Sequence, residues 1–484
     1  MRRTKIIATL GPATDDPAIL EQLILSGVDL FRMNYSHQDH NSHAFRIQQI
    51  RTLSKKLGME TGIIADLQGP KIRLERFKRG KILLKEHAPF ILDMQMDAGA
   101  GTKERVGVTY KKLARDVKRG NRLLLDDGRI VLEVEKVKGP EIFCTTVVGG
   151  ELSNSKGINL QGGGLSADGL TEKDKADLVH AASMGIDYLA ISFVRSAKDI
   201  LIPRAHLKKL KSHAHIIAKM ERTEALTNAE EIISAADAIM IARGDLGVEI
   251  GDAALPPVQK RLITLAREMD TAVITATQMM ESMIENQIPL RAEVFDVANA
   301  VLDGTDAVML SGETSMGLYP VKVVQAMANI CAETEKQRSI RVSDHRINTR
   351  FENIGEAISM STMYAANHIG ASAIAALTET GSTCLSMSRI SSGIPIFAFT
   401  RHLNTIRRVK LYRGVYPVPF DVTSTDTVKI NQEIVASLTD QDFVKEGELV
   451  IITKGDLRGR RGGTNNMKIV RAGDIIPDVD HFLE

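Results

Sequence analysis

The segment from Ile216 to Asp245 carries residues whose types and spacing suit chemistry. Lys219 and Glu221 lie at the end of one apolar run, and Asp245 follows the next run. Two carboxylates and an amine at neighbouring strand ends suit a divalent metal that holds a small oxyanion, with the amine stabilising negative charge that develops during a reaction. In a pocket poor in water such charges are weakly screened. The alternative is a structural salt bridge in which Lys219 only balances Glu221.

These residues need a scaffold that brings strand ends together. Eight short apolar runs alternate with segments of helical periodicity, and the runs are KIIATL, LFRMN, GIIADL, YLAISF, HIIAKM, AIMIAR, AVITAT and AVMLSG. Buried parallel strands form continuous apolar runs, and eight strand–helix units are the number that closes a (β/α)8 barrel. Asp15-Asp16-Pro17 also predicts the start of the first helix. The sequence therefore predicts an α/β protein built on a TIM barrel.

Polar residues follow most of the predicted strands, at the end where barrel enzymes place their catalytic groups. Along the chain they are Arg32, Asn34, Ser36, Asp66, Ser192, Lys219, Glu221, Arg243, Gly244, Asp245, Thr277, Gln278, Ser311 and Glu313. A single Asp or Thr at a strand end is usually a helix cap. Polar residues at seven of the ends instead predict one shared site.

Two further regions interrupt and follow the barrel pattern. From Lys71 to about residue 165, alternating strands and Gly or Asp turns predict a small β-barrel domain, inserted after the third strand and overhanging the barrel mouth. Glycines at both joints would let it close like a lid, and plain flexible loops are the alternative. Alternating helices and strands then predict an open α/β domain. The predicted boundaries are 1–69 and 166–344 for the barrel, 70–165 for the lid and 345–484 for a regulatory domain.

The composition limits the kind of protein. The 484 residues carry 62 Lys and Arg against 60 Asp and Glu, so a basic site must be local and a nucleic-acid-coating protein is not indicated. Three widely separated cysteines argue against disulfides and zinc and favour a reducing cytoplasm. The N-terminal apolar run is too short for a signal peptide, and no run approaches the roughly 20 residues that span a bilayer. We expect a cytoplasmic enzyme without a nucleic-acid or membrane partner.

Several long motifs occur in a defined order along the whole chain: MNYSH, ADLQGPKIR, NSKGIN, IIAKMERTEA, ARGDLGVEI, ITATQMMESM and DGTDAVMLSGET. They resemble the signature blocks of the pyruvate kinase family, and ITATQMMESM is similar to the bacterial members. The resemblance implies transfer of the phosphoryl group of phosphoenolpyruvate to ADP, which gives ATP and pyruvate in the last step of glycolysis. It also implies a homotetramer.

The resemblance implies roles for the charged residues of the site. Glu221 and Asp245 match the ligands of Mg2+, for which Mn2+ is an alternative, and hard carboxylate oxygens suit that ion. Lys219 matches the residue that stabilises the transferring phosphoryl group and the enolate. Arg32 matches a contact to the substrate phosphate, and the planar guanidinium group suits phosphate oxygens.

The remaining substrate contacts follow from the same resemblance. Gly244 and Asp245 match the start of a helix whose free N–H groups hold the substrate carboxylate. Thr277 matches a contact near the carbon where the enolate gains its proton. Whether Thr277 or a linked water delivers that proton stays open.

On the nucleotide side, Arg73 and Lys156 match contacts to the nucleotide phosphates, and Lys156 would reach over from the inserted domain. Asn34 and His37 also match nucleotide-side positions, although an ordinary surface histidine is an alternative for His37. The resemblance thus implies that ADP or ATP binds between the barrel mouth and the lid.

One position departs from the pattern of the potassium-dependent members of the family. The monovalent-cation site of the family uses oxygens that match Asn34, Ser36, Asp66 and the carbonyl of Leu67. Potassium-dependent members carry Glu where this chain has Lys71. Our hypothesis is that the ammonium of Lys71 supplies the charge otherwise provided by K+, so that activity does not require K+.

In the third region a hydroxyl-rich loop follows a strand and precedes a helix, and it resembles the effector loop of the family. Its candidate phosphate contacts are Thr378, Thr380, Gly381, Ser382 and Thr383, together with Arg461 from a later basic segment. We expect a phosphorylated allosteric effector here, AMP or a sugar monophosphate rather than fructose 1,6-bisphosphate. A plain strand–helix turn is the alternative.

Two other functions are weighed against this interpretation. A metal-dependent lyase or aldolase also holds a pyruvate enolate with paired carboxylates, but it leaves Arg73, Lys156 and the lid without a role. A catalytically inactive regulatory relative usually lacks a charged site residue, and all of them are present here. ADP-dependent turnover of phosphoenolpyruvate separates the three.

Overall fold

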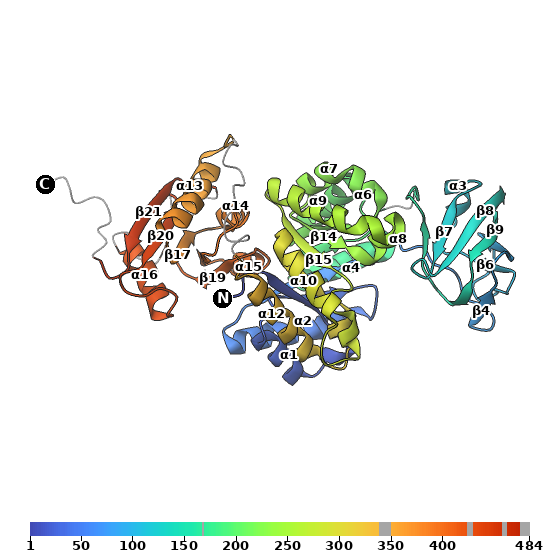
Figure 1. Ribbon diagram of the computed structural model, residues 1–484, viewed down its shortest axis with the longest axis horizontal. Coiled ribbons are helices and arrows are strands. Elements are labelled where there is room, and N and C mark those ends of the chain that lie inside the picture. The colour runs from blue at the N-terminus through green and yellow to red at the C-terminus, as the bar shows by residue number, and fades with distance from the viewer. Residues whose placement is uncertain (167–168, 338–349, 424–428, 457–461, 475–484) are drawn as a thin grey trace.

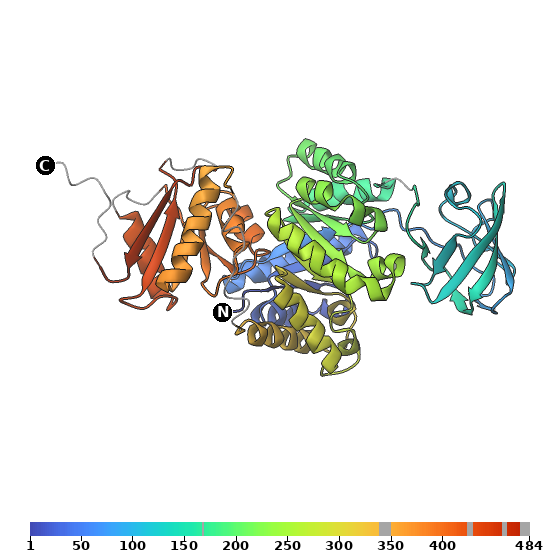
Figure 2. The same cartoon turned by 45° about the horizontal axis from the view of Figure 1, so that its top comes forward.

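The computed structural model describes residues 1–166, 169–337, 350–423, 429–456 and 462–474. Three bodies lie in a row, with the barrel in the middle, the C-terminal domain at one end and the inserted sheet domain at the other (Figure 1). In the turned view the three bodies remain separate along the same axis (Figure 2). The chain therefore leaves the barrel once to build the inserted domain and once more after its last helix.

Eight parallel strands close the central barrel in the order β1-β16-β15-β14-β13-β12-β3-β2. Their bounds are β1 Lys5–Thr9, β2 Leu30–Asn34, β3 Gly62–Asp66, β12 Tyr188–Ile191, β13 His215–Met220, β14 Ala238–Ala242, β15 Ala272–Ala276 and β16 Ala307–Leu310. Each of the eight apolar runs of the sequence becomes one of these strands, so the predicted (β/α)8 barrel is confirmed. The strands are almost entirely buried, which explains why the runs lack a polar alternation.

Helices cover the outside of the barrel, and their apolar faces pack on the strands in one large core. Their bounds are α1 Pro17–Leu25, α2 His40–Leu57, α4 Glu172–Ser183, α5 Lys198–Lys209, α6 Thr223–Thr227, α7 Ala229–Ala235, α8 Arg243–Ile250, α9 Leu255–Glu268, α10 Arg291–Asp303, α11 Gly312–Ser315 and α12 Pro320–Thr334. Helix α1 begins as predicted, because the Asp16 carboxylate accepts a hydrogen bond from the N–H of Ala18 and Pro17 takes the first helical position.

The inserted domain lies between β3 and α4 and has its own apolar core. Its elements are β4 Lys81–Leu84, β5 Pro89–Asp93, β6 Arg105–Gly107, α3 Leu113–Asp116, β7 Arg122–Leu125, β8 Ile130–Lys138, β9 Glu141–Val148, β10 Gly150–Ser153 and β11 Ile158–Leu160. A six-stranded sheet in the order β11-β7-β8-β9-β5-β6 is accompanied by the pair β10-β4. The predicted separate β domain is thus present as these two sheets.

The C-terminal domain has a five-stranded sheet in the order β19-β18-β17-β20-β21, in which only β21 is antiparallel. Its elements are α13 Ile354–Ile369, β17 Ala373–Leu377, α14 Ser382–Ser388, β18 Ile396–Thr400, α15 Leu403–Val409, β19 Val415–Pro419, α16 Ile430–Asp440, β20 Leu449–Lys454 and β21 Asn466–Arg471. The predicted open α/β domain is confirmed. Its predicted start at residue 345 lies outside the described residues.

A buried ion pair joins this domain to the barrel. Asp306 precedes β16, and its Oδ2 lies 2.8 Å from Nη1 of Arg389, which follows α14; both side chains are 1% exposed. The hydroxyl of Tyr188, at the start of β12, donates to the carbonyl of Arg408 at 2.8 Å. The C-terminal domain therefore packs on the amino ends of barrel strands, opposite the ends that carry the predicted site. Among the described residues, no helix is both long and apolar enough to cross a membrane.

Candidate active site

Asp66 lies among the polar side chains at the carboxyl ends of the barrel strands, and it is buried. Its Oδ2 accepts a hydrogen bond from Nε of Arg32 at 2.7 Å, and its Oδ1 lies 3.5 Å from Nζ of Lys219. Burial alone would raise the pKa of Asp66, but Lys219 and Arg32 outweigh burial and hold the pKa below its ordinary value. A permanent carboxylate therefore fixes the positions of two cations.

Lys219 extends from β13 into the same cluster. Its Nζ lies 2.7 Å from Oγ of Ser192 and 3.2 Å from Oε2 of Glu221, and only 13% of the side chain is exposed. Burial alone would lower the pKa of Lys219, but Asp66 and Glu221 more than compensate and raise it. Lys219 is therefore held as an ammonium, in surroundings that screen its charge weakly.

Glu221 is fully buried and only partly satisfied. Its Oε1 accepts a hydrogen bond from the N–H of Phe193 at 2.6 Å. Its Oε2 lies near Lys219 but makes no well-directed hydrogen bond. Burial, partly offset by Lys219 and reinforced by Asp245, raises the pKa of Glu221 to about 7. A buried oxygen in this state fits contact with a divalent cation, since cation binding would satisfy it and favour the carboxylate form.

Asp245 lies in the first turn of α8, beside a residue from the start of the inserted domain. Its Oδ1 lies 3.5 Å from Nζ of Lys71, and the two side chains are 26% and 28% exposed. The inserted domain thus contributes an ammonium at the edge of the acidic pair Glu221 and Asp245. Among the described residues, no three His, Cys, Asp or Glu side chains are arranged to hold a metal by themselves.

Thr277 and Gly244 lie in direct contact. The N–H of Gly244 donates to Oγ1 of Thr277 at 2.8 Å, and that hydroxyl donates to the carbonyl of Ala276 at 2.6 Å. Thr277 has a φ of 68°, a strained conformation for a β-branched residue, and Arg243 Nη2 donates to its carbonyl at 2.8 Å. The sequence pointed to the N–H of Gly244 as a free anion contact; in the structure this N–H already has a partner.

The predicted monovalent-cation residues come from adjoining ends of β2 and β3. Asn34 stands opposite Asp66 in the strand register, and the Asn34 Oδ1 accepts from the N–H of Ser36 at 3.2 Å. The carbonyl of Leu67 accepts from the Ser192 hydroxyl at 2.7 Å. His37 is exposed on the loop that follows. Partial burial, and then the nearby charges of Arg73, Arg32 and Lys71, lower the pKa of His37.

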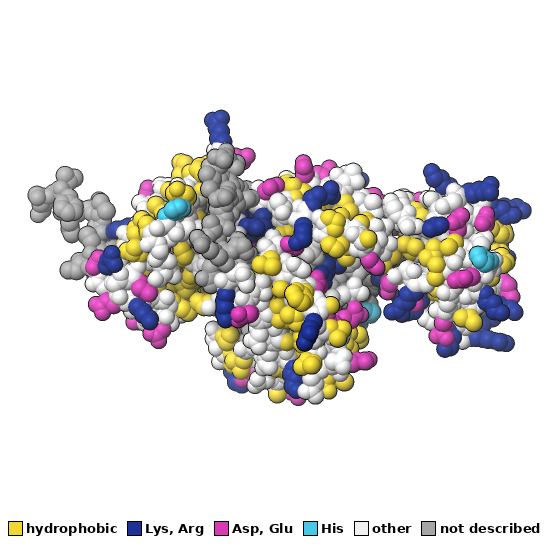
Figure 3. All heavy atoms as spheres, viewed as in Figure 1, with side chains coloured by type: hydrophobic (Ala, Val, Ile, Leu, Met, Phe, Trp, Pro, Cys, Tyr) yellow, Lys and Arg dark blue, Asp and Glu magenta, His cyan; other side chains and the backbone are white. Residues whose placement is uncertain are grey.

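Arg73 and Lys156 both belong to the inserted domain and lie on adjacent chain segments. Nη1 of Arg73 donates to the carbonyl of Ser155 at 3.0 Å, and Arg73 pairs with Gly157 in an isolated β-bridge. Nζ of Lys156 lies 2.8 Å from Oδ1 of Asp126. On the face seen in Figure 3, Lys and Arg side chains are frequent over this domain. Local basic charge thus exists in the inserted domain although the whole chain is nearly neutral.

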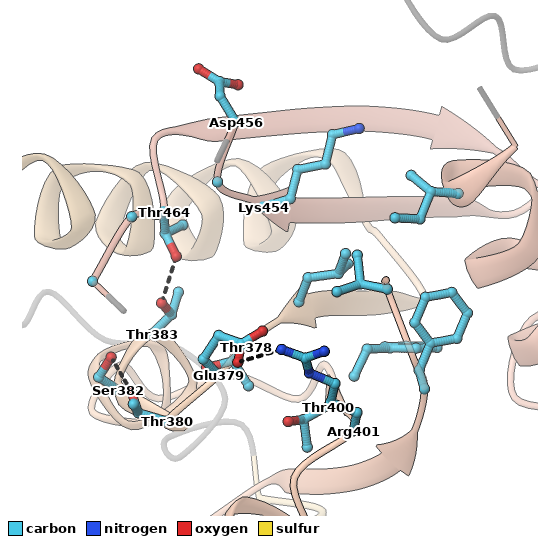
Figure 4. A pocket seen from close by; sticks show the side chains of 18 residues that line it. Thr378, Glu379, Thr380, Ser382, Thr383, Thr400, Arg401, Lys454, Asp456 and Thr464 are labelled. Carbon is cyan, nitrogen blue, oxygen red and sulfur yellow. Dashed lines mark hydrogen bonds and ion pairs between the residues drawn. The ribbon is translucent and has the colours of Figure 1, made fainter. Parts of the chain in front are cut away.

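The hydroxyl-rich loop of the C-terminal domain borders a cavity of about 230 Å3. Thr378, Thr380, Ser382 and Thr383 line it, with Arg401 and Lys454 from neighbouring strand ends (Figure 4). Gly381 does not line it, but its φ of 86° and its N–H bond to Oγ1 of Thr378 at 2.9 Å shape the loop. Arg461 lies outside the described residues. The sequence did not single out Arg401 and Lys454, because single basic residues at strand ends carry no motif.

Ser192 and Phe193 have a larger part in the barrel site than the sequence suggested. Ser192 contacts the ammonium of Lys219, and Phe193 contacts the carboxylate of Glu221. Phe193 has a φ of 57°, so the turn after β12 is held in a left-handed conformation. The sequence placed Ser192 at a strand end without assigning a role, and a backbone N–H contact from Phe leaves no signal in residue type.

Comparisons with known proteins identify the family of the chain. The family model "Pyruvate kinase, barrel domain" matches residues 1–324, and "Pyruvate kinase, alpha/beta domain" matches residues 356–470. Pyruvate kinase II of Salmonella typhimurium is 52% identical over 97% of this chain and 98% of its own length. A pyruvate kinase of Mycobacterium tuberculosis is 41% identical over 98% of this chain and 99% of its own length.

A solved structure gives the same result at the level of the fold. The crystal structure of a pyruvate kinase from Cryptosporidium parvum is similar with a TM-score of 0.91 and 32% identity, over 97% of this chain and 96% of that one. The matches extend over the barrel, the inserted domain and the C-terminal domain. The chain therefore belongs to the pyruvate kinase family, whose members are phosphotransferases.

Proposed function

We propose that the cluster of Arg32, Asp66, Lys219 and Glu221 transfers the phosphoryl group of phosphoenolpyruvate to ADP and releases pyruvate and ATP. The observation that carries this proposal is the buried ammonium of Lys219, held between two carboxylates at the carboxyl ends of the strands in a chain of this family. Positioning and charge stabilisation supply most of the catalysis in phosphoryl transfer. No observation favours a lyase or an inactive relative.

Glu221 and Asp245 would hold Mg2+ or Mn2+, which when bound neutralises and orients the substrate oxygens. Support comes from Oε2 of Glu221, which lies near Lys219 but accepts no well-directed hydrogen bond. With only these two carboxylates, oxygens of the substrate and of water would complete the set of ligands. Removal of divalent metal with a chelator should abolish turnover, and addition of Mg2+ should restore it.

Arg32 and Lys219 are proposed to act on the phosphoryl group and the enolate. Nε of Arg32 donates to Asp66 and Nη1 donates to Thr9, and these bonds orient the side chain. Among the described residues, they leave the Nη2 nitrogen without a protein partner. Lys219 presents a fixed positive charge where negative charge develops. Because both cations are already held in place, little reorganisation is needed when charge moves.

Thr277 and Gly244 are proposed to contact the substrate near the carbon that is protonated and at its carboxylate. In this proposal the substrate carboxylate replaces the Thr277 hydroxyl as the acceptor for the Gly244 N–H. To act as the proton donor, the Thr277 hydroxyl would also have to turn from the Ala276 carbonyl to the enolate, either directly or through a water. The strained backbone of Thr277 supports a functional reason for this conformation.

Arg73, Lys156, Asn34 and His37 are proposed to form the nucleotide side. Support comes from the basic charges that Arg73 and Lys156 bring from the lid and from the electrostatic proximity of His37 to Arg73. Lid closure would bring these cations to the phosphates of ADP while it excludes water.

Lys71 is proposed to replace K+. Support comes from its ammonium, which lies 3.5 Å from Oδ1 of Asp245. The candidate ligands of a monovalent cation are the oxygens of Asn34, Ser36, Asp66 and Leu67. A monovalent cation at those oxygens would then be unnecessary for charge balance. The contact between Lys71 and Asp245 would also couple the position of the lid to the acidic pair Glu221 and Asp245.

The C-terminal cavity is proposed to bind the phosphate of AMP or of a sugar monophosphate. Support comes from the hydroxyls of Thr378, Thr380, Ser382 and Thr383 and from the cations of Arg401 and Lys454 around one cavity. Arg461 is proposed as an additional contact on the resemblance alone. A cavity of about 230 Å3 with this lining suits a small phosphorylated ligand.

A homotetramer, a place in glycolysis and a cytoplasmic location are also proposed from the family. Among the described residues, Phe295, Ile288 and Leu318 are at least 68% exposed, as large apolar side chains at a subunit interface would be in an isolated subunit. The molar mass in solution, measured by light scattering, tests the tetramer.

The decisive experiment is the initial rate of pyruvate formation from phosphoenolpyruvate and ADP with Mg2+, in K+ and in tetramethylammonium at equal ionic strength. Equal rates support both the reaction and the role of Lys71. Activity in K+ alone keeps the reaction and rejects that role. Absence of activity in both salts, also with AMP or a sugar monophosphate present, contradicts the proposed function.

A further inference from the structure

Asp174 is a buried carboxylate near the active site to which the proposed reaction assigns no role. It lies in the first turn of α4, and its relative exposure is 0%. Among the described residues, its hydrogen-bond partners are N–H and O–H donors rather than a cation. A buried carboxylate is costly unless such donors satisfy it, so the position of each donor relative to Asp174 is strongly determined.

The two oxygens of Asp174 have different partners. Oδ2 accepts from the N–H of Thr171 at 2.9 Å and from its Oγ1 at 2.6 Å, which completes the capping box of α4. Oδ1 accepts from the N–H of Gly69 at 2.9 Å, a residue 105 positions earlier in the chain. One oxygen therefore caps a helix, and the other holds the joint through which the chain leaves the barrel for the lid.

Gly69 is also tightly enclosed by the turn after β12. Its φ is 67°, and a Cβ atom built there would lie 2.9 Å from Cβ of Ser192 and from Cδ2 of Phe193. Ser192 and Phe193 are the residues that contact Lys219 and Glu221. The lid joint is thus held between the carboxylate of Asp174 and the turn that orients the charged cluster.

The joint continues directly into Lys71 and Arg73. The N–H of Lys71 donates to the carbonyl of Gly69 at 2.9 Å, and Arg73 follows two residues later. Pro70 restricts the backbone between them, so a displacement of Gly69 is passed on to Lys71 rather than absorbed by a freely rotating residue.

We propose that Asp174 is a positioning residue for the lid: its Oδ1 fixes Gly69 against the Ser192–Phe193 turn, so that Arg73 is correctly placed for ADP. This inference rests on the proposed nucleotide role of Arg73. Its consequence is that loss of the Asp174–Gly69 bond should weaken the use of ADP more than the binding of phosphoenolpyruvate, because the contacts that hold Arg32 and Lys219 to Asp66 do not involve Gly69.

A reciprocal pair of variants separates the two oxygens. Asp174→Glu keeps the negative charge, and Glu is itself favoured at this position of a capping box. The extra methylene, however, displaces the carboxylate from Gly69. Thr171→Val removes the capping hydroxyl and leaves the Asp174–Gly69 bond in place. Steady-state kinetics of the full-length enzyme should show a KM for ADP about tenfold higher in Asp174→Glu, since small misplacements of binding groups are costly. The KM for phosphoenolpyruvate should change by less than about twofold.

In Thr171→Val the melting temperature should fall while the KM for ADP stays within about twofold of wild type. Hydrogen exchange of the peptide that covers residues 69–73 should be faster in Asp174→Glu and unchanged in Thr171→Val. An unchanged KM for ADP in Asp174→Glu, or equal kinetic and exchange effects in both variants, would overturn the inference and leave Asp174 as a helix cap only. An inactive wild-type enzyme would contradict the proposed function, whereas the exchange comparison would still decide the role of Asp174 at the joint.

Discussion

The barrel mouth and the C-terminal cavity are two candidate anion sites of the same chain, and they are built differently. At the mouth, Lys219 is 13% exposed and lies within 3.5 Å of two carboxylates. At the C-terminal cavity, Arg401 is 35% exposed and lies 3.9 Å from Glu379 and from Asp421. The first site holds its charges rigidly in a buried network, while the second presents hydroxyls and looser cations around an open cavity (Figure 4).

The difference shows what each site requires. Catalysis needs charges that are already in place when the reacting group becomes negative, and burial makes those charges effective. An effector needs only to bind one state of the protein more tightly than another. We therefore expect single substitutions to have large effects at the mouth and modest effects at the cavity.

Loss of the central cation is the strongest test of this contrast. Lys219→Met should lower kcat on the order of 10²–10³, as loss of one preorganised oxyanion partner does. The KM values should change much less, because Arg32 remains held by Asp66. Stopped or initial-rate assays with a protein of normal circular dichroism check this expectation, and near wild-type turnover would remove Lys219 from the proposed mechanism.

Reversal of the charge at Lys71 tests whether this side chain supplies the positive charge that K+ would otherwise bring to the barrel mouth. Lys71→Glu should make the enzyme dependent on K+, with about tenfold stimulation by K+ over tetramethylammonium, because one charge-assisted contact is worth ~1.5 kcal/mol. Lys81→Glu, an equivalent charge change on an exposed lid residue paired with Glu151, is the matched control. If both variants respond to K+ as the wild type does, Lys71 does not replace the cation.

At the C-terminal cavity a single hydroxyl should matter less. In Ser382→Ala, about fivefold more AMP or sugar monophosphate should be needed for the same thermal stabilisation, as expected for the loss of one hydrogen bond of ~1 kcal/mol. Ser386→Ala, on the same helix but not in the cavity lining, is the control. Equal ligand responses of the two variants and the wild type would argue against a phosphate at this loop.

The smallest effect concerns the surroundings of the mouth. Burial lowers the pKa of His43, stacked on Tyr35 with ring centroids 4.2 Å apart, to about 4. An unfolded histidine has a pKa near 6.5, so between about pH 6.5 and 4 the unfolded state binds more protons and stability falls as the pH falls. Between pH 7 and 5, the melting temperature of His43→Phe should therefore fall by about 2–4 °C less than that of the wild type.

Scanning calorimetry at both pH values measures this difference. His215, at the barrel base beside the C-terminal domain, also has a pKa lowered to about 4 by burial, and it provides a comparison at the other end of the barrel. An identical pH dependence of wild type and His43→Phe would show that His43 does not contribute to the acid sensitivity of the fold.

Much of the architecture was predictable from local pattern. The continuous apolar runs from KIIATL to AVMLSG required buried parallel strands, and their number required a closed barrel. Strand ends with Arg32, Asp66, Lys219, Glu221 and Asp245 could be recognised because charged residues interrupt apolar runs only where a function or a cap needs them. The inserted and C-terminal domains followed from the change of period along the chain.

The sequence by itself thus determined the fold class and the set of charged residues, because hydrophobic periodicity and residue type are local properties. Only the tertiary structure decided which groups touch: that the Gly244 N–H is engaged by Thr277, that Phe193 contacts Glu221 through its backbone, and that Asp174 reaches Gly69. Contacts of this kind join residues far apart in sequence, and all three involve a backbone N–H that every residue except proline carries. Their identity depends on how the strands close around a common axis, which no short segment encodes alone.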